Sequence, residues 1–192
     1  ILGSKTPKKK ISFLEETDMK FNYRDKVDLP SSKALMICLM DVSGSMGEEE
    51  KDLAKRFYIL LHMFLKRIYN NVEVVFVRHT TEAKEVTEEV FFNDRESGGT
   101  IVSSGLECAL DIIRARYNPD QWNIYMAQAT DGDNWSSDNN HVADLLTQHL
   151  LPICQYYAYT ELMTYRSLPS DLYEMMDKIK SGHKNLATAT IS

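Results

Sequence analysis

Cysteine, long apolar runs and excess positive charge are all scarce in this chain. Its three cysteines, Cys38, Cys108 and Cys154, each fall within an apolar stretch. An odd number in such places indicates reduced core thiols rather than a disulfide framework, and predicts a cytoplasmic protein. No apolar run reaches the ~18 residues that a membrane-spanning helix needs, so no membrane partner is expected. With 22 Lys and Arg against 28 Asp and Glu, the net charge of -6 argues against nucleic acid as a partner.

The chain also lacks internal repeats, low-complexity segments and a signal-peptide pattern, and it begins with Ile1 rather than Met. Its 192 residues, 43% of them hydrophobic and 26% charged, suffice for one domain with a substantial core. Residues 1–33 are polar and end in the connector Leu29-Pro30-Ser31-Ser32. We therefore expect a leader segment over residues 1–33, packed on or preceding a domain over residues 34–192.

The first strong signal in the chain is an unbroken apolar run, residues 35–40, that stops at Asp41. A short apolar run closed by turn-forming residues is typical of a buried strand in a parallel sheet. The loop that follows carries Ser43 and Ser45, so three oxygen-bearing side chains lie just past the carboxyl end of a strand. Mg²⁺ and Mn²⁺ prefer oxygen ligands, and ligands of open α/β sheets bind at this rim. The alternative is an ordinary polar turn, for which Asp, Ser and Gly are the commonest residues.

The rest of the chain alternates between strand-like and helix-like patterns. Strands are expected over residues 34–40, 72–77, 122–129, 153–160 and 185–191, a short edge strand and turn over 83–92, and helices over 48–69, 103–117, 138–151 and 169–180. In the first helix, one apolar stripe recurs at helical spacing and is expected to face the core: Leu53, Phe57, Leu60, Leu61, Phe64, Leu65 and Ile68. The order predicts an α/β fold with an open, doubly wound, mostly parallel sheet, helices on both faces and one antiparallel edge strand.

Two later loops carry polar residues that would meet Asp41 at the same edge of the sheet. Gly98-Gly99-Thr100 lets the backbone approach a bound group closely, and Asp131 stands just past another strand, followed by a glycine. Asp133 adds a carboxylate without a clear role, and Trp135 would be unusual on a surface without a partner to cover it. His79 ends the second strand, where it would support the metal ligands or contact a partner; a histidine hydrogen-bonded locally is the simpler alternative.

With these three loops together, the sequence resembles the von Willebrand factor A domains and their metal-ion-dependent adhesion site. The similarity lies in Asp41-Val42-Ser43-Gly44-Ser45, Gly99-Thr100 and Thr130-Asp131-Gly132, in that order. It implies that Ser43, Ser45 and Thr100 supply hydroxyl ligands to a Mg or Mn ion. Asp41 and Asp131 would hold the same ion largely through waters. It also implies a non-enzymatic module in which an Asp or Glu of a protein partner completes the coordination. The resemblance covers about residues 34–192, and the last helix that the family leads us to expect is missing.

A closer resemblance is to one bacterial branch, the YeaH/YhbH proteins, over their C-terminal half. It lies in residues 38–46, 55–61, 98–104, 121–125 and 131–135. Proteins of this branch are largely uncharacterised and cytoplasmic, with gene neighbours that encode a PrkA-type serine kinase and a SpoVR-like protein. The resemblance implies a place in a bacterial stress or sporulation-linked kinase pathway, with one of those proteins as a partner.

Two other classes of site share features with this one. Phosphatases and phosphotransferases of the haloacid-dehalogenase type also place an Asp after the first strand, and Asp131-Gly132-Asp133 imitates their later acidic loop. Their chemistry needs a second carboxylate two residues after the nucleophile, where this chain has Ser43. A nucleotide-binding glycine-rich loop would need a Lys-Ser/Thr pair or dinucleotide spacing, and the loop after Asp41 has neither.

Overall fold

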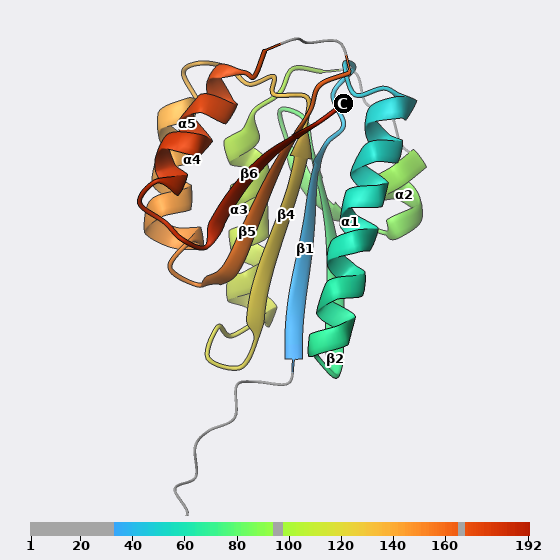
Figure 1. Cartoon of the computed structure of the whole chain (residues 1–192), viewed down its shortest axis with the longest axis vertical. Coiled ribbons are helices and arrows are strands. Elements are labelled where there is room, and N and C mark those ends of the chain that lie inside the picture. Colours follow the sequence, from blue (N-terminus) through green and yellow to red (C-terminus); the bar gives the residue numbers. More distant parts are fainter. Residues whose placement is uncertain (1–32, 94–97, 165–167) are drawn as a thin grey trace, which may run out of the picture. The chain divides into compact units, whose positions relative to one another are not determined.

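The domain is built on a six-stranded sheet with the strand order β3-β2-β1-β4-β5-β6 (Figure 1). The computed structural model describes residues 33–93, 98–164 and 168–192, so the predicted leader, except Lys33, lies outside the described residues. The strands are β1 Lys33–Asp41, β2 Asn71–His79, β3 Ala83–Val86, β4 Asn123–Thr130, β5 Cys154–Leu162 and β6 Leu186–Ile191. All neighbouring pairs are parallel except β2 and β3, which are antiparallel, and the predicted fold class is confirmed.

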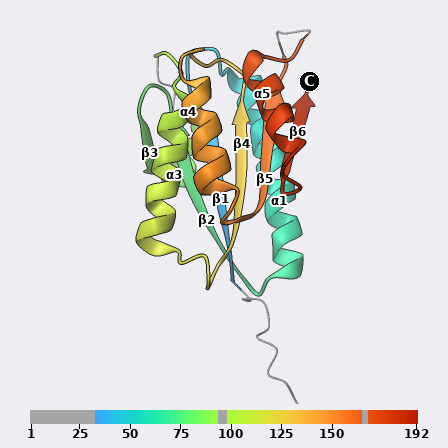
Figure 2. The same ribbon diagram turned by 90° about the vertical axis from the view of Figure 1, so that its left-hand side faces the viewer.

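Helices cover both faces of the sheet (Figures 1 and 2). They are α1 Glu48–Ile68, α2 Glu88–Asn93, α3 Val102–Arg116, α4 Asn139–Asp144, a π-helical continuation η2 Leu145–Leu150, and α5 Asp171–Lys180. One buried cluster joins the sheet to α3, α4, η2 and α5, and a second joins its other face to α1. No helix in the described ranges is long and apolar enough to cross a bilayer.

Three local expectations were wrong or incomplete. Of the short edge strand and turn expected over residues 83–92, the strand is present up to Val86, but the short helix α2 follows it in place of a turn. Phe91 is completely buried there, and its ring lies 5.6 Å from that of Tyr58. Packing of this aromatic side chain against α1 therefore outweighs the alternating local pattern. The single helix expected over residues 138–151 is half α-helical and half π-helical.

The apolar stripe predicted for the core face of α1 was correct in part. Leu65 is fully buried, and Leu53, Phe57 and Leu61 are partly buried against the same core cluster, whereas Leu60, Phe64 and Ile68 are exposed. The helix also packs through Ala54 and Tyr58, whose hydroxyl donates to the Leu39 backbone oxygen at 2.7 Å. Apolar residues occur on most of the circumference of α1, so helical spacing alone could not identify the face that meets the sheet.

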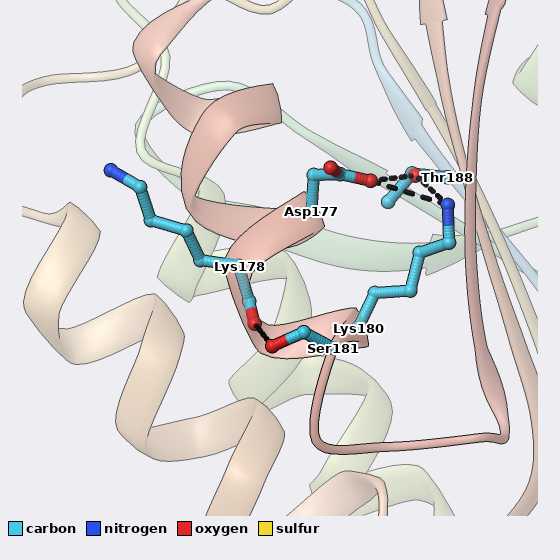
Figure 3. A network of polar contacts seen from close by, with 5 residues as sticks. All are labelled: Asp177, Lys178, Lys180, Ser181 and Thr188. Atoms are coloured by element: carbon cyan, nitrogen blue, oxygen red, sulfur yellow. Dashed lines mark hydrogen bonds and ion pairs between the residues drawn. The ribbon is translucent and has the colours of Figure 1, made fainter.

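The outer strand β6 is joined to α5 by a small polar network (Figure 3). Lys180 Nζ lies 3.2 Å from Asp177 Oδ1 and donates to Thr188 Oγ1 at 3.1 Å, and the Thr188 hydroxyl donates to Asp177 at 3.0 Å. Hydrogen bonds from Thr188 and Lys180 lower the pKa of Asp177. The contacts fix the edge strand to the helix that precedes it.

The strand order reverses between β1 and β4. In the sheet, β2 and β3 lie on one side of β1, and β4, β5 and β6 lie on its other side. The loops that leave the carboxyl ends of β1 and β4 therefore diverge, and ligands of open α/β sheets bind in the crevice at such a point. The register pairs Met40 with Ala129, which brings Asp41 next to Thr130.

Candidate metal centre

Asp41 is the point at which the three predicted loops meet. Its carboxylate is completely buried and accepts hydrogen bonds from the Ser43 backbone N–H at 2.8 Å, the Thr130 hydroxyl at 3.3 Å and the Thr100 hydroxyl at 3.4 Å. The donors belong to the β1–α1 loop, the end of β4 and the loop before α3. The convergence expected from the sequence is thus observed for Asp41, Ser43 and Thr100.

The hydroxyl-bearing loop after β1 opens toward solvent. Ser43 is buried and Ser45 is exposed, and their hydroxyl oxygens lie 3.2 Å apart. They line a pocket of about 330 Å³ together with Gly98, Gly99, Thr100 and the residues Asp133, Asn134 and Trp135. Several neutral oxygen donors with one vacant side are the arrangement in which Mg²⁺ or Mn²⁺ is bound with waters still attached.

Burial and a neighbouring carboxylate disfavour the ionised form of Asp41. Loss of solvation is the larger cause and the negative charge of Asp131 the next, and together they raise the pKa of Asp41 to about 7. Hydrogen bonds from Ser43 and Thr130 act in the opposite direction but are weaker. A cation between the two carboxylates would stabilise both charges, so the electrostatics of the site fit a bound dication.

The loop after β4 is held in a tight turn behind Asp131. The Thr130 hydroxyl accepts from the Gly132 N–H at 3.1 Å, and Asp131 Oδ1 accepts from the Asp133 N–H at 3.0 Å. Gly132 has a φ of 88°, and a Cβ there would lie 2.6 Å from Glu161 Oε2 and 2.7 Å from Ser170 Oγ. Only glycine fits this left-handed position beneath Asp131.

Glu161 forms the base of that turn and was missed from the sequence. It is completely buried at the end of β5 and accepts from the Ser170 N–H at 2.9 Å and the Ser170 hydroxyl at 2.5 Å. Ser170 in turn caps α5 by accepting from the Tyr173 N–H at 3.0 Å. Glu161 thus connects the loop that carries Asp131 to the start of α5.

Asn134 and Asp138 were also missed, because their role depends on helix α3. Asn134 Oδ1 accepts from the Val102 N–H at 3.1 Å and Asp138 Oδ2 from the Ser103 N–H at 3.0 Å. Both N–H groups belong to the first turn of α3, where backbone donors have no acceptor within the helix. This turn begins two residues after Thr100. The side chains therefore fix the Thr100 loop against the Asp131 loop. A polar residue shortly after the predicted Asp131 was the only sequence signal.

The three residues proposed as supporting or partner-contacting groups differ in outcome. Trp135 is 56% exposed and lines the pocket, and its indole nitrogen lies 3.2 Å from where a Cβ on Gly99 would be. Asp133 is half-buried at the pocket wall.

His79 does not face a partner. It is paired with Asp41 in the sheet, but its ring is completely buried against Gly105, and neither ring nitrogen has a hydrogen-bond partner among the described residues. Burial lowers the pKa of His79 to about 4. A ring with no exposed surface does not support a direct contact with a partner. Its backbone oxygen does accept from the Val42 N–H at 3.0 Å, which supports the loop after Asp41.

Within the described ranges, no group of three or more His, Cys, Asp or Glu side chains is placed to hold a metal ion. A site here would therefore depend on Ser and Thr hydroxyls as much as on carboxylates. The three cysteines, all within those ranges, are free thiols; Cys38 and Cys154 are buried as predicted and Cys108 is half-buried.

The sequence model of the family described as "Protein of unknown function (DUF444)" matches residues 3–192. A UPF0229 protein of Legionella pneumophila (strain Corby) is 50% identical over 187 residues, covering 96% of this chain and 44% of the relative. Another, from Vibrio vulnificus (strain CMCP6), is 51% identical over 181 residues, covering 94% of this chain and 42% of the relative. The chain thus spans less than half the length of the curated relatives it matches.

Solved structures of similar fold have much lower sequence identity. The conserved hypothetical protein BatB from Bacteroides thetaiotaomicron matches with a TM-score of 0.56 at 13% identity, covering 83% of this chain and 90% of BatB. VWA2, the ArnB paralog from Sulfolobus acidocaldarius, matches with a TM-score of 0.51 at 10% identity, covering 84% of this chain and 41% of VWA2. These similarities concern the fold, which is of the von Willebrand factor A type.

Proposed function

The chain belongs to the family of unknown function DUF444, and from this membership and the geometry around Asp41 we propose a metal-ion-dependent protein-binding module. Ser43, Ser45 and Thr100 would hold a Mg or Mn ion through their hydroxyls, with Asp41 and Asp131 as the negative groups. The observation that carries the proposal is the buried Asp41 carboxylate, which accepts hydrogen bonds from three separate chain segments beside an open pocket.

The residues present fit such an ion in kind and in charge. Mg²⁺ prefers hydroxyl, carboxylate and water oxygens. Two carboxylates match the charge of a dication, and three neutral hydroxyls leave part of its octahedral coordination sphere to water or to another oxygen. When bound, the ion would supply a Lewis-acid position facing the pocket. An Asp or Glu of a protein partner is the group we propose to complete its coordination.

The chain's own side chains would select among carboxylate-bearing partners. Trp135 is a large exposed aromatic residue at the pocket wall, and such residues dominate binding energy at protein interfaces. Asp133, on the same wall, disfavours a partner with a second acid on that side. We therefore expect the carboxylate of the partner to lie next to apolar or basic residues.

The proposal also covers the branch of the family, the cellular location and the partner. The sequence resembles the YeaH/YhbH branch, and from it we infer a cytoplasmic bacterial protein linked to stress or sporulation. A PrkA-type serine kinase or a SpoVR-like protein is the candidate partner. Because the relatives are more than twice as long as this chain, their remaining length contributes to any such pathway role.

We propose that the module is not an enzyme. In the haloacid-dehalogenase alternative, Asp41 would be a nucleophile and position 43 would hold an acid–base carboxylate. Asp41 has no exposed surface and accepts three hydrogen bonds, and Ser43 cannot act as a general acid near neutral pH. Metal-dependent phosphatase turnover that Asp41→Asn abolishes would overturn this part of the proposal.

The test is metal-dependent capture of a partner from bacterial extract. Immobilised wild-type protein, a Ser43→Ala/Ser45→Ala variant and a Ser136→Ala/Ser137→Ala control would be loaded in Mg²⁺ and eluted with EDTA. Ser136 and Ser137 are exposed and lie outside the pocket lining, so the control removes two hydroxyls without touching the site. We expect EDTA to elute the same proteins from wild type and control but not from the site variant. Equal capture by all three would refute the proposal.

A further inference from the structure

Helix α1 carries a second candidate interaction surface, which is apolar, whereas the site around Asp41 is polar. Five large apolar side chains on its C-terminal half are exposed: Ile59, Leu60, Met63, Phe64 and Ile68, which we call the α1 patch. Leu60 is 68% exposed and Met63 is 59% exposed. At 100° per residue the five cover one side of the helix, opposite the buried Ala54, Tyr58 and Leu65. A contiguous exposed patch of this kind marks an interaction site more often than scattered single residues do.

The charged side chains of α1 that flank the α1 patch are basic, whereas α2 places Glu88 on the other side of the adjoining pocket. Between Leu53 and Ile68 the chain has four basic residues and no acidic one, although the whole protein carries a net charge of -6. The four, Lys55, Arg56, Lys66 and Arg67, are all exposed. Arg56 is paired with Asp52 at 2.6 Å, and Lys55 lies 5.1 Å above the ring of Phe92, which leaves Lys66 and Arg67 as the main positive groups at the C-terminal end.

A pocket of about 180 Å³ lies at the edge of the α1 patch. It is lined from α1 by Tyr58, Ile59 and His62 and from α2 by Glu88 and Phe92. The remaining lining residues belong to β1 and β2: Met36, Cys38, Val74 and Phe76. Met36 and Cys38 have almost no exposed surface, whereas Val74 and Phe76 are partly exposed. A dry apolar cavity of about 150 Å³ accommodates a benzene-sized ring, so this pocket has room for one Leu or Phe side chain.

We propose that the α1 patch docks an acidic amphipathic helix of a partner protein, with one bulky apolar side chain inserted between α1 and α2. Helices bind grooves in this way through apolar anchors spaced three and four residues apart. Acids along the partner helix would lie over Lys66 and Arg67, because Glu88 at the pocket rim repels them from the other side.

Two other occupants fit the same surface less well. A second copy of this chain would present the same four cations and no acid between Leu53 and Ile68, so this stretch offers no complementary charge to its own copy. An anionic membrane would also contact Glu88 and Glu89 on α2 and Glu48 and Glu49 at the start of α1, all of which are exposed. A bilayer has no single side chain to fill the pocket, whereas a helix does.

The test uses the whole chain in EDTA, so that it is independent of the metal site. The probe is a labelled synthetic helical peptide of about 16 residues, ~24 Å long, with Leu and one Phe at every third or fourth position and Glu elsewhere. A matched peptide has Lys in place of Glu. The variants are Leu60→Ser/Phe64→Ser, Lys66→Glu/Arg67→Glu and, as control, Leu168→Ser, which changes a 77% exposed leucine outside the patch.

In fluorescence anisotropy, we expect wild type and the Leu168→Ser control to bind the Glu peptide equally, and more weakly as salt is added. Leu60→Ser/Phe64→Ser should weaken binding at least about tenfold with unchanged circular dichroism, and Lys66→Glu/Arg67→Glu should reverse the preference to the Lys peptide.

Failure of wild type to bind the Glu peptide, or equal binding by Leu60→Ser/Phe64→Ser, would overturn the proposal. So would either alternative occupant. Binding to phosphatidylcholine–phosphatidylserine vesicles that this variant loses would assign the patch to a membrane. A dimer in sedimentation analysis that the variant dissociates would assign it to a second copy.

Discussion

Replacing Asp41 by Asn removes one charge from the point where the three loops meet and leaves the shape nearly unchanged. In wild type, burial and Asp131 raise the pKa of Asp41 from 3.8 to about 7. The folded protein therefore binds this proton more tightly than the unfolded chain does. The resulting stability is present below pH 3.8 and is lost as the pH rises through 7. At 1.36 kcal/mol for each pKa unit, the loss amounts to about 4 kcal/mol.

An asparagine at this position cannot ionise, so the Asp41→Asn variant escapes this loss. Without metal, we expect its stability relative to wild type to improve by about 4 kcal/mol between pH 4 and pH 8. For a domain of this size, that corresponds to a shift in relative Tm on the order of 10 °C. Thermal unfolding in EDTA across this pH range measures it, with exposed Asp111→Asn as the control.

Mg²⁺ should offset much of this loss in wild type. A dication binds the ionised Asp41, so it should raise the Tm of wild type more strongly as the pH rises. At a concentration 100 times Kd, the stabilisation is about 2.7 kcal/mol. Asp41→Asn should respond little. A stability difference between wild type and variant that does not change with pH in EDTA would refute the electrostatic reasoning.

Three other substitutions test separate parts of the structure. Gly132→Ala should destabilise the fold by about 2–3 kcal/mol in urea unfolding, because it combines a positive φ with overpacking. Gly44→Ala, with no atom within 4 Å of its Cβ, should be nearly neutral, and equal effects would contradict this reasoning. His79→Gln should abolish a stability loss of about 3 kcal/mol as the pH falls from 6.5 to 4, because burial lowers the pKa of His79 to about 4; an unchanged pH profile would disprove it. Trp135→Ala should lower the affinity for the captured partner at least about tenfold while leaving the Mg²⁺-induced rise in Tm intact. Loss of that rise would assign Trp135 to the metal site instead.

The sheet and the loops at its carboxyl edge were predictable because their signals are local. Residues 35–40 are apolar without interruption and Asp41 ends them, so both the buried strand and the position of the loop follow from a few residues. The carboxyl ends of neighbouring parallel strands share one edge, and this places Asp41 near Asp131 before any distance is known.

The groups that support those loops were not predictable, because their roles arise from contacts between distant elements. Glu161 is an ordinary polar residue in strand-like sequence, and only the register of β4 and β5 puts it beside Thr130 and beneath Gly132. In the sequence Asn134 looks like an ordinary turn residue, and only the structure shows that its side chain accepts from the first turn of α3. On α1, apolar residues cover so much of the helix that the exposed Leu60 and the buried Leu65 look alike in sequence.

The central claim is that hydroxyls and carboxylates from three loops hold one dication. Calorimetric titration of Mn²⁺ into metal-free protein at pH 8 tests it most directly, with wild type and Ser43→Ala/Ser45→Ala compared side by side. We predict one saturable ion per wild-type chain and an affinity at least about tenfold weaker for the variant. Wild-type protein that binds no Mn²⁺, or a variant that binds it equally well, would contradict the account.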